Sequence, residues 1–179
     1  MPSEIKFGTD GWRAIIADGF TFKNVRIAAH GLAGEMLESG SANAGAVIAW
    51  DTRFASERFA IATAEVLTGN GIRCLLATRP APTPATSFSV IDHKGGAGGM
   101  ITASHNAGSY NGFKVKSGRG GSAPPDMVAR IEAEIDRIES GEVSLRSLAL
   151  DEAETTGLLE RFDPVGPYLE QLEHVVDIE

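Results

Sequence analysis

Residues 44–78 read AGAVIAWDTRFASERFAIATAEVLTGNGIRCLLAT, and this stretch decides the fold class. Short apolar runs stand at its two ends, one before Asp51 and one after Gly71. Uninterrupted apolar runs of this length are typical of strands that are buried on both faces of a sheet. The segment between them reads as a helix that begins at Ser56, a candidate cap, and stops at Gly-Asn-Gly. Strand, helix and strand in this order indicate an α/β domain with parallel strands.

The same alternation continues on both sides of this stretch. Upstream, apolar residues recur at helical spacing behind Thr21, a candidate N-cap. The predicted downstream elements are a helix within 79–94, strands over 98–104 and 111–117, and an amphipathic helix over 124–141. Only a short loop separates the last two strands, which suits an antiparallel hairpin. We therefore expect a three-layer α/β/α domain with a mixed, mostly parallel four-stranded sheet.

The C-terminal part carries weaker signals. Residues 142–162 have little periodicity and read as a connection, and a further helix is predicted to begin after Pro167.

Charge is unevenly distributed along the chain, because residues 1–131 hold 13 Lys+Arg against 10 Asp+Glu, whereas residues 132–179 hold 3 against 14. The first part has no dense Lys/Arg stripe, so we expect no nucleic-acid partner. We assign the acidic tail no binding role.

Location and redox state follow from what the sequence lacks. No apolar run approaches the roughly 18 residues of a membrane helix, and the N-terminus shows no signal-peptide pattern. We therefore expect a cytoplasmic protein with no membrane association. Cys74 is the single cysteine and lies in an apolar run, which favours a buried structural thiol.

Functional residues of open α/β sheets gather on the loops that follow the strands. In the first candidate loop, residues 6–14 (KFGTDGWRA), Gly8 and Gly11 permit close approach of the backbone to a ligand. Arg13 adds a multidentate donor for phosphate, and the alternative is an ordinary turn with a surface arginine.

The second candidate loop is WDTRFASER, residues 50–58. We expect Asp51 to pair with Arg53 and Ser56 to cap the helix that follows. The alternative is that Asp51 orients Arg13 or another residue of the site.

The third candidate loop lies in MITASHNAGSYNGFKVK, residues 100–116, where Ser104 follows a predicted strand. A serine hydrolase is disfavoured, because the chain has no G-x-S-x-G elbow and His105 is poorly placed to act as base for its neighbour. A hydroxyl, Lys114 and exposed backbone N–H groups suit the binding or covalent transfer of a phosphoryl group. The other interpretation is a polar turn. Residues 95–120 supply no carboxylate for a phosphate-bound Mg²⁺.

These loops resemble the motifs of one family. TASHNAGSYNGFKV is similar to the active-site segment T-A-S-H-N-P … Y-N-G-F-K of the α-D-phosphohexomutases, the phosphoglucomutase/phosphomannomutase family. FGTDGWRA resembles the G-T-x-G-x-R loop of that family, and WDTRFAS is similar to its D-x-R segment. PTP stands where the family has the same three residues. Four motifs in the family's order span about 115 residues of the chain.

The resemblance implies a role for each matching residue. Ser104 matches the serine that carries a phosphoryl group and passes it to a hexose monophosphate, so that a hexose 1,6-bisphosphate forms. That intermediate returns its other phosphate to the serine, which interconverts the 1- and 6-phosphates. Lys114 matches a general acid/base, and Arg13 matches the arginine that contacts the phosphoryl group. The residues implied to line the site are His105, Asn106, Thr9 and Gly11.

The resemblance also implies a cofactor and further domains. Mg²⁺ is expected on a phosphoryl oxygen of Ser104, with its other ligands in a second domain, and hexose 1,6-bisphosphate is expected as activator. Residues 1–150 match domain I, and residues 151–179 match a linker and the first helix of a truncated domain II. The hexose phosphate substrate and the missing domains II–IV of the same chain are the expected partners. We thus expect an isomerase whose fragment has little activity alone; the alternative is a stand-alone phosphate-binding module without turnover.

One residue departs from the family pattern inside the serine motif. Ala107 stands where proline is usual, next to Gly108. A proline ring would restrict the unfolded chain, so alanine at this position is expected to make the serine loop more flexible. The missing domains leave the preferred sugar open among glucose, mannose and glucosamine phosphates.

Overall fold

The computed structural model describes residues 5–8 and 10–177. The elements in chain order are β1 (Trp12–Ile15), α1 (Phe22–Glu38), the 3-10 turn η1 (Ser41–Ala44), β2 (Ala46–Trp50), α2 (Ser56–Gly69), β3 (Cys74–Ala77), α3 (Thr83–Asp92), β4 (Ala97–Ile101), β5 (Tyr110–Ser117), α4 (Pro125–Glu139), α5 (Leu150–Thr155), β6 (Leu159–Phe162) and α6 (Gly166–Val175). None of the described helices is long and apolar enough to cross a membrane.

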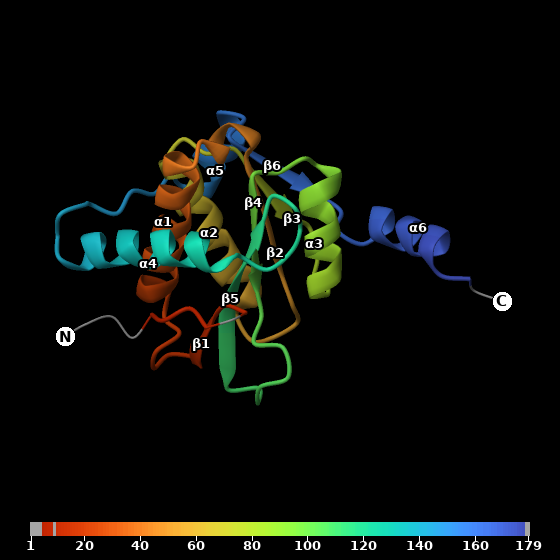
Figure 1. Cartoon of the computed structure of the whole chain (residues 1–179), viewed down its shortest axis with the longest axis horizontal. Helices are drawn as coiled ribbons and strands as arrows, with labels where there is room; N and C mark the ends of the chain where they lie inside the picture. Colours follow the sequence, from red (N-terminus) through yellow and green to blue (C-terminus); the bar gives the residue numbers. More distant parts are fainter. Residues whose placement is uncertain (1–4, 9, 178–179) are drawn as a thin grey trace.

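A single mixed sheet forms the middle layer, with strand order β1-β5-β4-β2-β3-β6. β2 pairs in parallel with β3 and β4, β3 pairs in parallel with β6, and β5 is antiparallel to both β4 and β1. α1 and α2 pack on one face and α3 on the other, with α4 lying across the outside of α1 (Figure 1). The expected α/β/α layers, the parallel core and the antiparallel hairpin are confirmed.

The expected number of four strands is wrong, because β1 and β6 add one strand at each edge. β1 begins inside residues 6–14, the segment that reads as a glycine-containing loop, and ends one residue beyond it. β6 lies inside 142–162, which therefore contains a helix and a strand rather than a plain connection. Glu160 and Arg161, the two central residues of β6, are exposed, so this strand has no apolar run by which it could be recognised.

The predicted helix ends are mostly confirmed. The Thr21 hydroxyl accepts a hydrogen bond from the Asn24 N–H at 3.2 Å, which satisfies one free donor at the start of α1. α2 ends before Asn70 and Gly71, and Gly71 adopts a positive φ of 77°. α6 begins at Gly166, whereas the predicted start lay after Pro167, and none of its residues is buried. Cys74 is buried as expected, and burial raises the pKa of its thiol to about 12.

An aromatic cluster fixes β1 to the helical layer. The ring of Trp12 stacks on Phe20 at a centroid distance of 4.8 Å, and Phe59 of α2 contacts Phe20 edge-on at 4.8 Å. Trp12 and Phe20 are almost completely buried. Burial of rings of this size contributes a large share of packing energy. β1 thus carries Arg13 to the sheet end at which the β2 and β4 loops emerge.

The first prediction concerns Gly112, where β5 passes between its two neighbours. A Cβ at this position would lie 2.5 Å from the Thr102 carbonyl oxygen and 2.9 Å from that of Trp12, so backbone would have to move. We expect Gly112→Ala to lower the free energy of unfolding by about 1–3 kcal/mol, as overpacking does. Gly108 has no atom within 4 Å of such a Cβ, so Gly108→Ala is the matched control. Urea denaturation measures both, and equal stabilities of the two variants would contradict the close packing of β1, β5 and β4.

Candidate active site at the ends of β2 and β4

Ser104 lies on an exposed loop directly beyond the carboxyl end of β4. Its backbone is left-handed, with φ 53°, a conformation that is uncommon for a residue other than glycine. The Ser104 N–H donates to the Thr102 hydroxyl at 3.0 Å, and the Thr102 N–H donates to the Gly112 carbonyl at 2.9 Å. The loop is therefore fixed to β5 at its base, while the serine side chain faces solvent.

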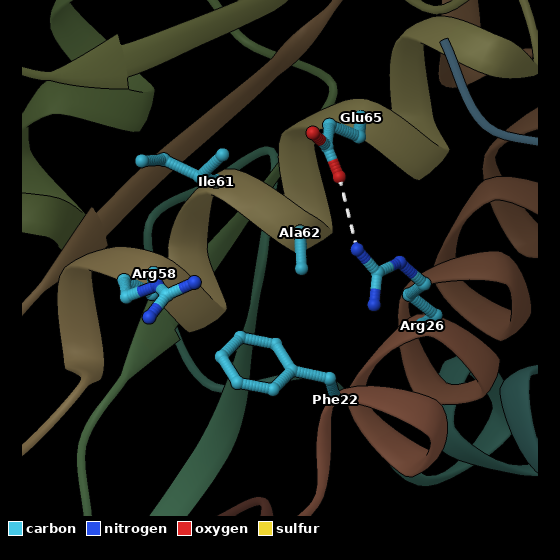
Figure 2. Close-up of a pocket in the computed structure, with 6 residues that line it drawn as sticks. All are labelled: Phe22, Arg26, Arg58, Ile61, Ala62 and Glu65. Atoms are coloured by element: carbon cyan, nitrogen blue, oxygen red, sulfur yellow. Dashed lines mark hydrogen bonds and ion pairs between the residues drawn. The ribbon is translucent and has the colours of Figure 1, made fainter. Parts of the chain in front are cut away.

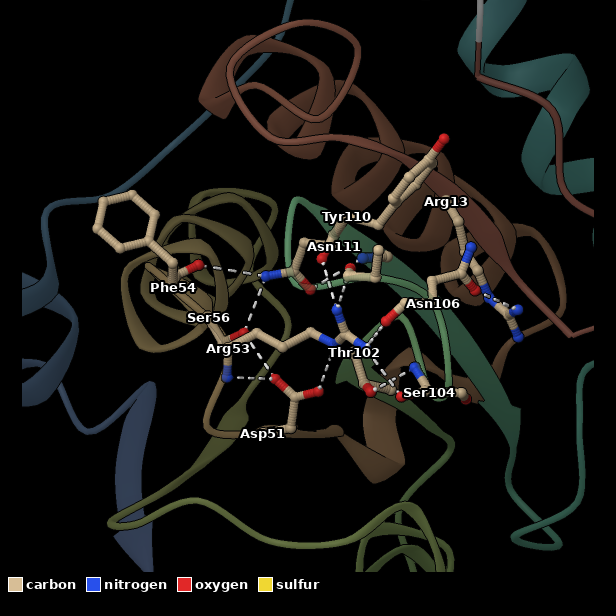
Figure 3. A network of polar contacts seen from close by, with 12 residues as sticks. Arg13, Asp51, Arg53, Phe54, Ser56, Thr102, Ser104, Asn106, Tyr110 and Asn111 are labelled. Atoms are coloured by element: carbon tan, nitrogen blue, oxygen red, sulfur yellow. Dashed lines mark hydrogen bonds and ion pairs between the residues drawn. The ribbon is translucent and has the colours of Figure 1, made fainter.

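Arg53, on the loop after β2, lies in the middle of this region (Figure 3). Its Nη1 donates to the carbonyls of Ala107 and Tyr110 at 2.8 and 2.9 Å. Its Nη2 donates to the carbonyls of Ser104 and Asn106 at 2.8 and 2.6 Å. The guanidinium thus contacts both ends and the middle of the serine loop.

Asp51 holds Arg53 from the other side. Its Oδ2 lies 3.3 Å from Arg53 Nε, and its Oδ1 accepts hydrogen bonds from the Arg53 N–H at 3.0 Å and the Ser56 hydroxyl at 2.8 Å. The Asn111 amide donates to the same Ser56 hydroxyl at 2.8 Å, which ties the start of β5 to the start of α2. The expected Asp51–Arg53 pair is confirmed.

One other expectation for this loop is wrong. Ser56 is not the cap of α2, since Ala55 holds the N-cap position with φ 58° and the Ser56 hydroxyl is turned toward Asp51 instead. The alternative for Asp51 was that it orients Arg13 or another residue of the site; its carboxylate binds Arg53, which contacts the serine loop, rather than Arg13. The four carbonyl contacts of Arg53 were not expected from the sequence.

The first candidate loop reaches the serine loop through Arg13. Its Nη1 donates to the Asn106 side-chain carbonyl at 3.0 Å, and both residues are partly buried. Gly11 has φ 95°, and a Cβ there would lie 2.5 Å from the Phe113 carbonyl oxygen, so glycine is required. His105 is exposed, and its side chain makes no hydrogen bond or ion pair with the described residues. Thr9, implied by the resemblance to line the site, lies outside the described residues.

Lys114 is buried in β5, paired with Met100 of β4, and only 5% exposed. Its Nζ donates to Asp10 Oδ2 at 2.5 Å and makes no contact with Ser104 within the described part of the chain. Lys116 Nζ lies 3.9 Å from the other oxygen of Asp10, which also accepts from the Ser122 hydroxyl at 3.3 Å. Asp10 therefore faces two lysines. The sequence did not indicate that Asp10 is the partner of Lys114.

The charges around Asp10 alter two pKa values. Partial burial works to raise the pKa of the Asp10 carboxyl, but the hydrogen bond and charge of Lys114, with Lys116 and Ser122, outweigh it and lower that pKa. Burial lowers the pKa of Lys116, and the charge of Asp10 only partly opposes this. The cluster therefore stabilises the carboxylate form of Asp10, whereas Lys116 holds its proton less firmly than an exposed lysine does.

Carboxylates for a metal ion are scarce at this end of the sheet. Asp10 is paired with lysines and Asp51 with Arg53. Within residues 5–8 and 10–177, no group of three or more His, Cys, Asp or Glu side chains is arranged to hold a metal ion. The described residues therefore do not form a metal site by themselves.

A groove between α1 and α2 is a separate feature. It is lined by Phe22, Arg26, Arg58, Ile61, Ala62 and Glu65 (Figure 2). Arg26 pairs with Glu65 at 3.2 Å, and both arginines lie over the Phe22 ring. The groove contains no nucleophile or catalytic acid–base pair and shares no residue with the serine loop, so the chemistry is assigned to the loop.

The comparisons with known proteins agree with the motifs. Residues 4–142 match the family model described as phosphoglucomutase/phosphomannomutase, alpha/beta/alpha domain I. The chain belongs to this family. Its match covers the sheet from β1 to β5, all three candidate loops and α4, so domain I is the part that is present.

Relatives and solved structures extend this result. The phosphoglucomutase of Staphylococcus saprophyticus is 38% identical over 139 residues, which is 76% of this chain and 25% of that protein. The phosphoglucosamine mutase of Clavibacter sepedonicus is 33% identical over 136 residues, 73% of this chain and 30% of that protein. A crystal structure from Thermus thermophilus, named as a putative phosphomannomutase, matches with TM-score 0.85 and 34% identity over 99% of this chain and 37% of its own. The chain thus spans about a quarter to a third of the length of these proteins.

A second prediction tests the Asp10 cluster through its pH dependence. Because the folded pKa of Asp10 is lowered, its ion pair stabilises the fold above the unfolded aspartate pKa of about 3.9 and is lost as the pH falls through the folded value. We expect Asp10→Asn to cost about 1 kcal/mol at pH 7, given the partial exposure of Asp10, and progressively less below about pH 4. Urea denaturation across this range measures the difference. Asp18 is exposed and has no side-chain partner in the described residues, so Asp18→Asn is the control. If the loss of unfolding free energy in Asp10→Asn did not decrease at acid pH, the pairing would be contradicted.

Proposed function

We propose that this chain is the phosphoserine domain of a mutase that moves a phosphoryl group within hexose phosphates. The observation that carries the proposal is the placement of Ser104 on an exposed loop whose backbone is held by Arg53 and whose Asn106 side chain accepts a hydrogen bond from Arg13. Phosphoryl transfer depends chiefly on positioning and on stabilising negative charge, and this arrangement provides both. The family membership supports the same assignment.

In the proposed reaction Ser104 carries a phosphoryl group on its hydroxyl oxygen. The free hydroxyl of a hexose monophosphate attacks that phosphorus, loses its proton and releases the serine oxygen, so a hexose 1,6-bisphosphate forms. After the intermediate turns round, Ser104 takes the other phosphate and the second monophosphate leaves. Lys114 serves as proton donor or acceptor near the reacting hydroxyl, and Arg13 neutralises charge on the phosphoryl group. His105, Asn106 and Gly11 are proposed to line the site, and the family resemblance implies the same for Thr9, which lies outside the described residues.

Mg²⁺ belongs to the proposal only through Ser104. A phosphoryl oxygen on this serine is the ligand that the chain supplies, because the nearby carboxylates are already paired with cations. The remaining ligands would come from outside the described residues. When bound, the ion would reduce the negative charge of the phosphoryl group.

The domain organisation is likewise proposed. Residues 1–150 are proposed as the phosphoserine domain and residues 151–179 as the lead into a second domain. β6 lies beyond residue 150 but pairs with β3, so the sheet of the first domain extends past that boundary. α6 fits the opening helix of that second domain, since Leu169, Val175 and Val176 are exposed apolar residues. We propose that domains II–IV supply the sugar and distal phosphate contacts, in a cytoplasmic enzyme. Relatives of this chain are named for glucose, mannose and glucosamine phosphates, so hexose phosphate is the substrate class proposed.

The third prediction tests the serine. In the complete product of the reading frame that contains these residues, Ser104→Ala should lower conversion of glucose 1-phosphate to glucose 6-phosphate by at least about 10³-fold, because a covalent nucleophile is removed. Ser109 lies exposed in the same loop, and Ser109→Ala should keep wild-type activity. A coupled assay of glucose 6-phosphate measures both variants, and near-normal activity of Ser104→Ala would refute the assignment.

The same assay on the 179-residue chain tests the need for further domains. We expect little or no turnover, since domain I alone provides neither a metal carboxylate set nor the other substrate contacts. Robust turnover by the chain alone would overturn that part of the proposal, and a stop codon directly after Glu179 would favour a stand-alone phosphate-binding module.

A further inference from the structure

We propose that Arg53 is a positioning residue whose guanidinium fixes the conformation of the serine loop, residues 104–110. The inference rests on the proposed function for its chemical meaning, because the loop matters only if Ser104 carries the phosphoryl group. Arg53 itself makes no contact with the Ser104 hydroxyl. It acts on the backbone that presents that hydroxyl.

The geometry uses the full donor set of the side chain. An arginine has five N–H donors in a fixed planar fork. Here four of them point at the carbonyls of Ser104, Asn106, Ala107 and Tyr110, at 2.6–2.9 Å, and Nε faces Asp51 at 3.3 Å. The side chain of Arg53 is only 14% exposed, so water competes little for these contacts. A surface arginine that merely paired with Asp51 would not require four backbone partners.

The contact explains how Ser104 keeps its left-handed backbone. A non-glycine residue in such a conformation costs about 1–3 kcal/mol and persists only where its surroundings fix it. The Ser104 N–H is held by the Thr102 hydroxyl and its carbonyl by Arg53. Both peptide groups that flank the serine are therefore restrained, one of them by an ionised donor, for which hydrogen bonds are strongest.

The same contact orients the free amides of the loop. All described peptide bonds are trans, so each carbonyl that faces Arg53 turns the N–H of the next residue away from it. Within the loop, the N–H groups so directed belong to His105, Ala107 and Gly108, and they have no acceptor among the described residues. The fourth is the N–H of Asn111, which already lies in β5. Successive free N–H groups make an anion-binding concavity. Arg53 thus turns the carbonyls inward and leaves donors on the opposite side of the loop.

Arg53 also bears on Ala107, the departure from the family's motif. A proline at this position would restrict the backbone of the loop covalently, whereas alanine leaves φ free. The Ala107 N–H has no partner in the described residues, so a proline would remove no hydrogen bond there. The Ala107 carbonyl is one of the four that Arg53 binds. The two restraints, ring and guanidinium, should therefore partly replace each other.

Amide hydrogen exchange of the 179-residue chain tests the inference directly. Lysine keeps the charge of Arg53 but cannot reach four carbonyls, so Arg53→Lys should speed exchange at the N–H groups of Ser104, Asn106 and Tyr110 by about tenfold or more. Exchange in β2 should stay unchanged. Arg58→Lys is the matched control, because Arg58 lies on α2 over the Phe22 ring and away from the loop. Unchanged loop exchange in Arg53→Lys, or an equal rise in loop and β2, would overturn the inference.

The functional readout is the transfer of a phosphoryl group from glucose 1,6-bisphosphate to Ser104, followed by intact mass. Arg53→Lys should slow this uptake by about 10–100-fold, as expected for a misplaced reacting group. Adding Ala107→Pro to Arg53→Lys should restore part of both the uptake and the loop protection, whereas a general loss of stability would not be rescued in this way. Uptake at the wild-type rate in Arg53→Lys would refute positioning. This uptake is measured in the complete product of the reading frame, which carries the other substrate contacts. If that wild-type protein takes up no phosphoryl group, the proposed donor chemistry fails, and the exchange comparison still decides the role of Arg53.

Discussion

The fixed directions of the Arg53 N–H groups are the constraint around which the serine loop is built. Backbone carbonyls of a loop normally face water, and here four of them converge on one ion. Hydrogen bonds to a charged donor each contribute about 1.5–3 kcal/mol, which is enough to offset the strain of one left-handed serine. Asp51 makes this arrangement possible by pairing with the largely buried guanidinium. The loop therefore needs no helix or strand of its own to hold one shape.

A second constraint is the burial of Lys114 in the middle of β5. A buried ammonium requires a compensating charge, and Asp10 provides it from the first loop. In the proposed function the incoming phosphoryl group carries the same sign of charge as Asp10 and would compete for the same lysine. Asp10 is 40% exposed and its partner Lys114 only 6%, so the carboxylate is the member of the pair that can move.

Several parts of this fold were predictable because a single physical signal dominates each of them. β2 and β3 are buried on both faces, which demands apolar runs, and Thr21 caps α1 through a local hydrogen bond that sequence spacing reveals. β6 was missed because an edge strand of four residues with two exposed charged residues has no such signal. Its register is set by the free edge of β3, a property of the assembled sheet rather than of residues 159–162.

The candidate site also combines features that nearby residues in the sequence predict with contacts that exist only in the folded chain. The residue types of Ser104, Arg13 and Lys114 were enough to suggest phosphate chemistry, and the pair Asp51–Arg53 followed from its spacing. The partner of Lys114 lies 104 residues away, and the direction of a carbonyl leaves no trace in side-chain identity, so neither contact was predictable. Ser56 shows where a local rule fails. Serine at a helix start is a preferred cap residue, but here its hydroxyl donates a hydrogen bond to Asp51 and does not cap the helix.

The division of labour within the proposed enzyme follows from what this domain contains. In the proposed function Arg13, Lys114 and the free loop amides act on a phosphoryl group, which every substrate of such a mutase shares. Apolar or polar contacts to a particular sugar hydroxyl are not required for that step, and the relatives of this chain carry names that differ in the sugar. A domain that recognises only the common part of its substrates can be retained while the sugar changes. What such a domain must provide is the correct position of Ser104, and this position depends on the few contacts that hold the serine loop.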